Sequence, residues 1–176
     1  FVGSPGDDCV NFNILWAGAT SYGATKFNYA DDGRSELILD ANSNVYVAAC
    51  SRSAGFPTTA GAYQATFGGT QDAVVFKMNS TLSAMIFSTY LGGTGTDAAY
   101  GLKLDNSNNV YVTGGSTGGF PTTAGVLQPT YNGGTADAFI AVLNSTGTAL
   151  SRSTYLGTAA YDQAYLIEID ANGDIY

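Results

Sequence analysis

Residues 97–125 read DAAYGLKLDNSNNVYVTGGSTGGFPTTAG, and this stretch decides the fold because parts of it return elsewhere in the chain. Its last seven residues, GFPTTAG at residues 119–125, occur unchanged at residues 55–61. The phrase STYLG, which precedes the stretch at residues 88–92, occurs again at residues 153–157. Identical phrases in the same order, about 65 residues apart, are the sequence signature of a repeat protein.

Within one period the sequence predicts four short strands and no helix. Residues 98–105 alternate and end at a polar turn, after which residues 110–115 (VYVTGG) read as the second strand of a hairpin. A connection rich in Gly, Pro and Thr covers residues 118–134, and residues 138–143 (AFIAVL) and 148–156 follow as two further strands. Four short antiparallel strands in about 65 residues describe one blade of a β-propeller.

The repeat divides the chain into units of an all-β fold. Residues 32–96 and 97–160 are predicted to form two blades, and residues 161–176 the first half of a further one. The segment 1–31 matches the repeat poorly and is interpreted as the last strands of a preceding blade. About three blades are too few for a closed ring, which needs roughly 4–8. We therefore expect the chain to be part of a larger ring, with the remaining blades in the same polypeptide.

The composition excludes several classes of function. The chain of 176 residues contains 6 Lys and Arg against 14 Asp and Glu, which gives a net charge of -8. This sign disfavours nucleic acids and anionic membrane surfaces as partners. The absence of histidine removes His-dependent catalytic triads and His-ligated metals from this chain. We also expect no direct membrane insertion, because no run of about 18 apolar residues occurs.

The repeated phrases resemble a known family of bacterial repeats. YLGGTGTD at residues 90–97, LDNSNNVYVTG at 104–114, GFPTTAG at 119–125 and DAFIAVLN at 137–144 are similar to SBBP β-propeller repeats. The likeness extends over residues 32–176. It implies an exported or outer cell-surface bacterial protein in which the propeller serves interaction or adhesion. Many such proteins resemble type IX secretion cargo of Bacteroidetes, whose sorting domain would lie beyond Tyr176. The family supplies no catalytic residues that could be transferred.

The aspartates are the obvious catalytic candidates, but most of them recur with the repeat. A catalytic pair is normally unique within a ring, whereas a carboxylate that caps a turn recurs wherever the turn does. We therefore predict that these residues are structural, in Asx-turns and in bonds to loop amides. Eight of the 14 acidic residues occupy repeated positions: Asp32, Asp97 and Asp162; Asp40, Asp105 and Asp170; Asp72 and Asp137.

Three polar loops resemble the first half of a calcium-binding loop, since oxygen ligands alternate in them. Val45 stands where an EF-hand needs glycine, and no Glu follows at the twelfth position. Polar hairpin turns explain the loops without metal, so we expect no cofactor, with calcium as the alternative. The candidate ligands are Asp40, Asn42, Asn44, Asp105, Asn109, Asp170, Asn172 and Asp174.

Aromatic residues on the long connections are candidates for an interaction surface. Phe56, Phe120 and Tyr131 lie on loops that we expect at the loop-bearing end of the ring, within residues 53–69 and 116–134. Exposed aromatic rings on loops can stack on sugars or contact a partner. The alternative is that each Phe anchors its loop onto the blade, and repetition favours this alternative.

Cys9 and Cys50 are the two cysteines of the chain. They form either one disulfide of an exported protein or two buried thiols, and the sequence leaves both open.

We predict a non-catalytic extracellular or cell-surface module that binds protein or glycan. One alternative is a carbohydrate-active enzyme with carboxylates in the channel of the propeller. The other is cargo captured together with its export or surface machinery.

Overall fold

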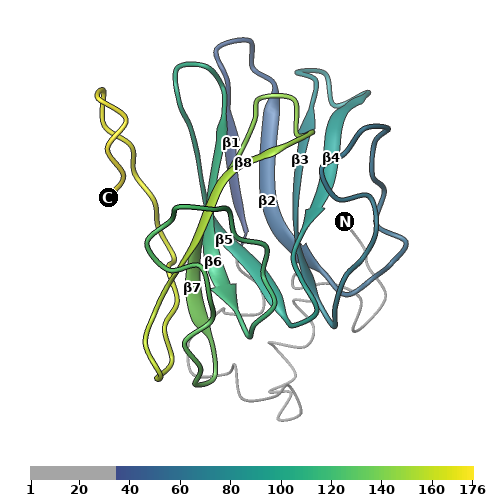
Figure 1. Ribbon diagram of the computed structural model, residues 1–176. Helices are drawn as coiled ribbons and strands as arrows, with labels where there is room; N and C mark the ends of the chain where they lie inside the picture. Colours follow the sequence, from purple (N-terminus) through teal and green to yellow (C-terminus); the bar gives the residue numbers. More distant parts are fainter. Residues whose placement is uncertain (1–34) are drawn as a thin grey trace, which may run out of the picture.

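The computed structural model describes residues 35–176, and these residues contain strands, turns and loops but no helix. They form two four-stranded antiparallel sheets, each with its strands in sequence order (Figure 1). The first sheet consists of β1 (Glu36–Leu39), β2 (Val45–Ser51), β3 (Asp72–Met78) and β4 (Met85–Leu91). The second consists of β5 (Asp97–Leu104), β6 (Val110–Ser116), β7 (Asp137–Leu143) and β8 (Leu150–Leu156).

The all-β prediction is therefore confirmed, down to four strands in each repeat. The strands form where β-branched and aromatic residues gather, as in Val45-Tyr-Val of β2 and Phe139-Ile of β7. Short polar turns join β1 to β2 and β3 to β4, while a long connection joins β2 to β3. The second sheet repeats this plan. The two sheets lie within the predicted blades 32–96 and 97–160.

The two sheets pack face to face and share one hydrophobic core. This core runs through both sheets and includes Tyr46 and Val75 of the first, and Leu102 and Phe139 of the second. At the junction Glu36 of β1 accepts the backbone N–H of Leu102 at 2.6 Å. Because this cluster contains residues of both sheets, the contact between the blades is part of the hydrophobic core.

Residues 161–176, yellow in Figure 1, continue the pattern as isolated bridges. Tyr161 forms a parallel bridge with Ala136, as Thr96 does with Gln71 one repeat earlier. Tyr165 stacks on Tyr100 of β5 with ring centroids 5.1 Å apart. The interpretation of this segment as half a blade stays a prediction, and the predicted segment 1–31 lies outside the described residues.

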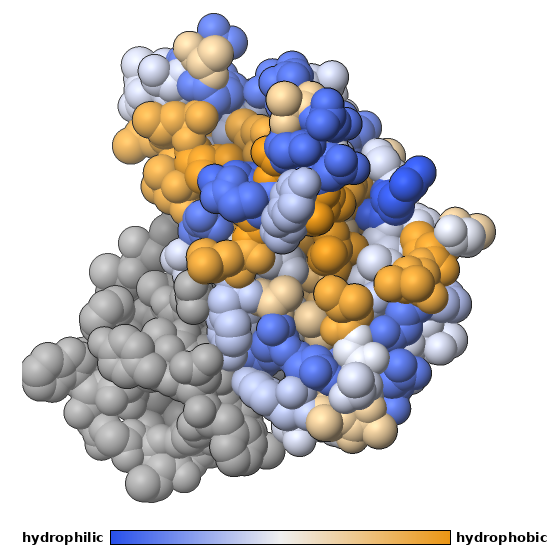
Figure 2. Space-filling view, turned by 90° about the vertical axis from the view of Figure 1, so that its left-hand side faces the viewer, coloured by the Kyte–Doolittle hydropathy of each residue, from blue (hydrophilic) through white to orange (hydrophobic). Residues whose placement is uncertain are grey.

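The surface carries apolar as well as polar side chains, which Figure 2 shows as separate patches on one face. No helix within residues 35–176 has the length and apolar character needed to cross a membrane. The exposed large apolar side chains are Leu37, Leu39, Leu82, Ile86, Leu127, Leu156, Leu166, Ile175 and Tyr176.

Candidate functional site

The aspartates at the start of the short hairpins act as turn caps. Oδ1 of Asp40 accepts the backbone N–H groups of Asn42 and Asn44, both at 2.9 Å, and Oδ2 accepts the Asn44 side-chain amide. Lys77 of β3 forms an ion pair with the same Oδ2 at 3.1 Å. Burial raises the pKa of Asp40, but hydrogen bonds from Asn44 and Lys77 outweigh it and lower that pKa to about 2.

The same bonds recur in the other two loops. Asp105 accepts the N–H groups of Ser107 and Asn109, and Asp170 accepts those of Asn172 and Asp174. These are the Asx-turns that the repeat predicted. Among residues 35–176 no group of three or more His, Cys, Asp or Glu side chains is arranged to hold a metal ion. The turn accounts for the recurring carboxylate, and calcium binding stays an untested alternative.

Replacing Asp105 with Ala is expected to lower the free energy of unfolding by about 2 kcal/mol, because two backbone N–H groups lose a charged acceptor. Asp105→Asn is the matched control and should retain most of the stability, since its side-chain oxygen can still accept both N–H groups. Urea unfolding of the three proteins measures the difference. Equal stability of Asp105→Ala and the unchanged chain would show that the turn forms without the cap.

Phe120 anchors its connection onto the second blade. Its ring is 4% exposed and stacks on Phe139 with centroids 3.9 Å apart. Its N–H donates to the hydroxyl of Tyr155 at 2.7 Å. Phe56 is held in the same manner, with its N–H bonded to Tyr90 at 3.1 Å. The anchor interpretation therefore holds for Phe120, whose ring is too buried to serve an interaction surface.

Tyr131 also turns inward. Its ring packs against Tyr155 with centroids 6.0 Å apart, and its hydroxyl donates to the carbonyl of Gly134 at 2.9 Å. The three aromatic candidates thus lie apart along two loops and do not combine into one exposed platform. Cys50 is buried at the end of β2 and is disulfide-bonded. Cys9, the other cysteine of the chain, lies outside the described residues.

In each blade a Gln and an Asp side chain are hydrogen-bonded to each other and hold the long connection against the sheet. We call this pair the bracket: Gln64 with Asp72, and Gln128 with Asp137. Gln64 donates its amide to Oδ2 of Asp72 at 3.0 Å, and its Oε1 accepts the N–H of Gly92 at 3.0 Å. Oδ2 of Asp72 also accepts the N–H of Gly68 at 2.8 Å. The bracket ties the connection, the start of β3 and the end of β4 together.

The second blade has the same bracket. Gln128 bonds Oδ2 of Asp137 at 3.0 Å and accepts the N–H of Gly157 at 2.9 Å. Sequence reasoning predicted a structural role for Asp72 and Asp137 but missed their glutamine partners. The signal was present, since both glutamines stand two residues before a Thr in matching connections.

Asp97 is the first residue of β5 and is fully buried at the junction of the blades. Burial raises the pKa of its carboxyl to about 7, against the lowering effect of the Gly93 N–H and the Ser116 hydroxyl. The negative charge of Asp72 raises it further. Burial also raises the pKa of Asp72. Such a pKa is typical of catalytic carboxylates, but it also follows from burial alone.

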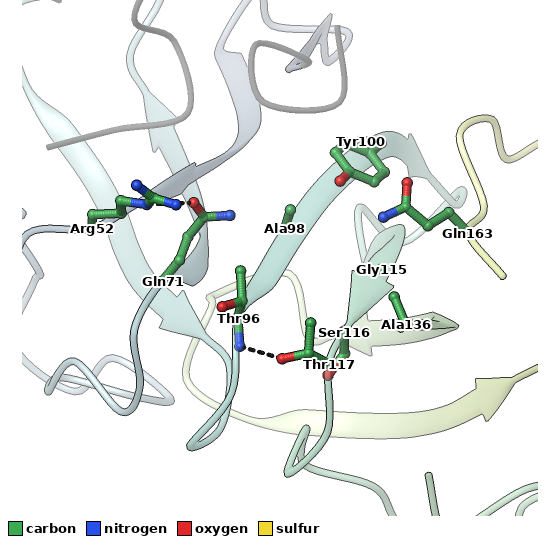
Figure 3. Close-up of a pocket in the computed structure, with 10 residues that line it drawn as sticks. All are labelled: Arg52, Gln71, Thr96, Ala98, Tyr100, Gly115, Ser116, Thr117, Ala136 and Gln163. Carbon is green, nitrogen blue, oxygen red and sulfur yellow. Dashed lines mark hydrogen bonds between the residues drawn. The ribbon is translucent and has the colours of Figure 1, made fainter. Parts of the chain in front are cut away.

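A small polar pocket, lined in part by the two chain neighbours of Asp97, opens where the first blade, the second blade and residue 163 meet (Figure 3). Its volume of about 20 Å³ holds roughly one water molecule. Nε of Arg52 donates to Oε1 of Gln71 at 3.2 Å, and the N–H of Thr96 donates to Thr117 at 2.8 Å. The lining consists of Arg52, Gln71, Thr96, Ala98, Tyr100, Gly115, Ser116, Thr117, Ala136 and Gln163.

Two of the lining residues depart from the repeat. Arg52 and Gln71 stand where the second blade has Thr117 and Ala136. The pocket therefore combines a guanidinium, amides and hydroxyls at one point of the ring, and this combination suits a small polar ligand group. Sequence reasoning missed both residues, although their departure from the repeat was the available signal.

The comparisons with known proteins agree with this architecture. Residues 86–121 match the SBBP family model, described as a beta-propeller repeat. The matched segment runs from β4 across the blade junction and through β5 and β6 to the first residues of the connection anchored by Phe120. No curated protein matches the chain. Residues 86–121 thus resemble a beta-propeller repeat, and the two four-stranded antiparallel sheets have the architecture of propeller blades.

Proposed function

We propose that this chain is a non-catalytic propeller module that binds a protein or glycan at the outer surface of a bacterium. The pocket at Arg52 and Gln71 carries the proposal. Repeated residues build the blades, so a polar pair that breaks the repeat at the loop-bearing end is the feature expected of a binding site. The SBBP repeat at residues 86–121 supports the module, and the resemblance supports an exported protein of the type IX cargo kind.

The chemistry of the pocket supports a polar ligand. Thr96, Thr117 and Gln163 line it with hydroxyl and amide groups, and Arg52 adds a planar set of N–H donors. Sugars and peptide groups present matching donors and acceptors. The proposal requires no cofactor, no nucleic acid and no insertion into a membrane.

A carbohydrate-active enzyme is the second candidate, because the raised pKa of Asp97 suits general acid catalysis. Two observations weigh against it. Asp97 and Asp72 are both 0% exposed, so a substrate cannot reach them in this conformation. Both also have counterparts in the repeat, Asp162 and Asp137, as expected for structural residues.

Arg52→Ala is expected to weaken glycan binding at least tenfold, because the pocket loses its cationic donors. The 176-residue chain is applied to an array of bacterial and host oligosaccharides, and the affinity for each bound glycan is measured by calorimetry. Arg152→Ala, which removes an exposed arginine of β8, is the matched control and should bind normally. Circular dichroism confirms that both variants fold.

Two results would contradict the proposal. Release of reducing sugar from any glycan of the array would favour the enzyme. Failure of the chain to bind any glycan or any purified surface protein would remove the binding function altogether.

A further inference from the structure

Two buried carboxylates approach each other across the junction of the blades. Asp72 begins β3 of the first blade, Asp97 begins β5 of the second, and both are 0% exposed. Gly92 lies between them. A Cβ at this glycine would lie 2.8 Å from Oδ1 of Asp72 and 2.9 Å from Oδ2 of Asp97. The two oxygens are therefore less than about 6 Å apart, within the range where like charges interact strongly.

Hydrogen bonds satisfy only one side of each carboxylate. Oδ2 of Asp72 accepts the N–H of Gly68 and the amide of Gln64, and Oδ2 of Asp97 accepts the N–H of Gly93 at 2.7 Å. Oδ1 of Asp72 and Oδ1 of Asp97 are buried and have no hydrogen-bond partner. A buried charged oxygen without a donor is costly, and two such carboxylates side by side cost more. Protonation of one carboxylate reduces both costs.

The phenols that face the pair titrate at a higher pH than the pair does. Tyr90 of β4 faces Asp72, Tyr155 of β8 faces Asp97, and burial raises the pKa of both phenols above 10. Ser116 of β6, the strand partner of Asp97, carries no charge. The guanidinium of Arg52 is hydrogen-bonded to the side chain of Gln71, the residue before Asp72. Asp137 is a further carboxylate near this end of the second blade. Its negative charge raises the pKa of Tyr155, and its Oδ1 is buried without a hydrogen-bond partner.

The backbone couples this pair to the contact between the blades. The N–H of Asp97 donates to the carbonyl of Gln71, the residue before Asp72, at 2.8 Å. Gln71 and Thr96 also form a parallel bridge. A change in charge at the pair therefore acts directly on the hydrogen bonds that hold the second blade against the first.

We propose that Asp72 and Asp97 share one proton near neutral pH, and that its loss weakens the contact between the two blades. The proposal concerns the junction and is independent of the ligand at the pocket. It makes the propeller a pH-sensitive module, which is tighter in mildly acidic surroundings.

The direction of the effect follows from the pKa values. The pKa of Asp97 in the folded chain is about 7 against a usual value of 3.8, and that of Asp72 is raised as well. The folded state therefore binds the proton more tightly than the unfolded state. The resulting stabilisation is complete below pH 3.8 and is lost as the pH rises through about 7. Asp40, with a pKa of about 2, has the opposite effect, but only below pH 4.

The test is urea unfolding of the 176-residue chain between pH 4.5 and 9. The unfolding equilibrium constant should increase by up to about tenfold per pH unit towards pH 7 and become constant above it. Asp97→Asn should abolish this increase, since the amide carries no charge. Asp162→Asn is the matched control, because Asp162 occupies the same repeat position but is only partly buried and should leave the increase intact. The protection factors of the Asp97 and Gly93 N–H groups, which correct hydrogen exchange for its base-catalysed intrinsic rate, should fall over the same pH range.

Three results would overturn the proposal. The unchanged chain could show no pH dependence in this range, or Asp97→Asn could retain it. Millimolar calcium could abolish it, which would show that the pair holds a cation instead of a proton. If Asp97→Asn does not fold, carbon NMR of the carboxyl groups of the unchanged chain decides. An apparent pKa near 7 supports the shared proton, and two values below 5 exclude it.

Discussion

Phe139→Ala is expected to lower the free energy of unfolding by about 3–5 kcal/mol, the range typical of a truncated buried phenylalanine. The Phe139 ring is 0% exposed and lies in the core shared by the two blades. The ring of Phe120 stacks on it at an interplanar angle of 21°. The truncation therefore leaves a cavity and releases the anchor of the long connection at once. Urea unfolding with tryptophan-independent detection, such as far-ultraviolet circular dichroism, measures the loss.

Two variants bracket this result. Phe139→Leu keeps most of the buried volume and should cost clearly less than the alanine variant. Leu127→Ala lies on the same connection but is 83% exposed, so its effect should stay within about 0.5 kcal/mol. A loss below 1 kcal/mol for Phe139→Ala would contradict the shared core.

Gly93→Ala is expected to lower the free energy of unfolding by about 3 kcal/mol, the upper end for overpacking. A Cβ at this position would collide with the backbone carbonyl of Gly119. That backbone cannot easily yield, because the next residue, Phe120, is buried and its N–H is bonded to Tyr155. For a chain of this size the change corresponds to a Tm lower by roughly 6–12 °C, which scanning calorimetry resolves.

The repeat provides the matched control for this glycine. Thr158 occupies the same repeat position at the end of the second blade and already carries a side chain. Its hydroxyl bonds Asp162 at 2.9 Å, so Thr158→Ala should cost only the energy of about one hydrogen bond, near 1 kcal/mol. Equal losses for Gly93→Ala and Thr158→Ala would show that the close approach to Gly119 does not limit the junction.

Much of the blade could be predicted from the sequence because its determinants are local. Strand alternation, the hairpin turns and the Asx-turns of Asp40 and Asp105 each involve residues within about ten positions of one another. The Asx-turn at Asp105, for example, is complete between residues 105 and 109. The brackets of Gln64 and Gln128 span 28 and 29 residues to the glycines whose N–H groups they accept, and that distance hid them from pattern reasoning.

The sequence by itself determined that the chain is a repeat of four-stranded blades and that its hairpin aspartates are turn caps. Only the tertiary structure decided which equivalent positions of the repeat differ in burial and in the space available for a side chain. Position 93 tolerates no side chain, whereas its counterpart Thr158 carries one. Asp97 is fully buried, whereas its counterpart Asp162 is only partly so. The physical reason is that packing and desolvation depend on which residues of the next blade lie against a given position. The repeated sequence alone does not specify these contacts across the junction.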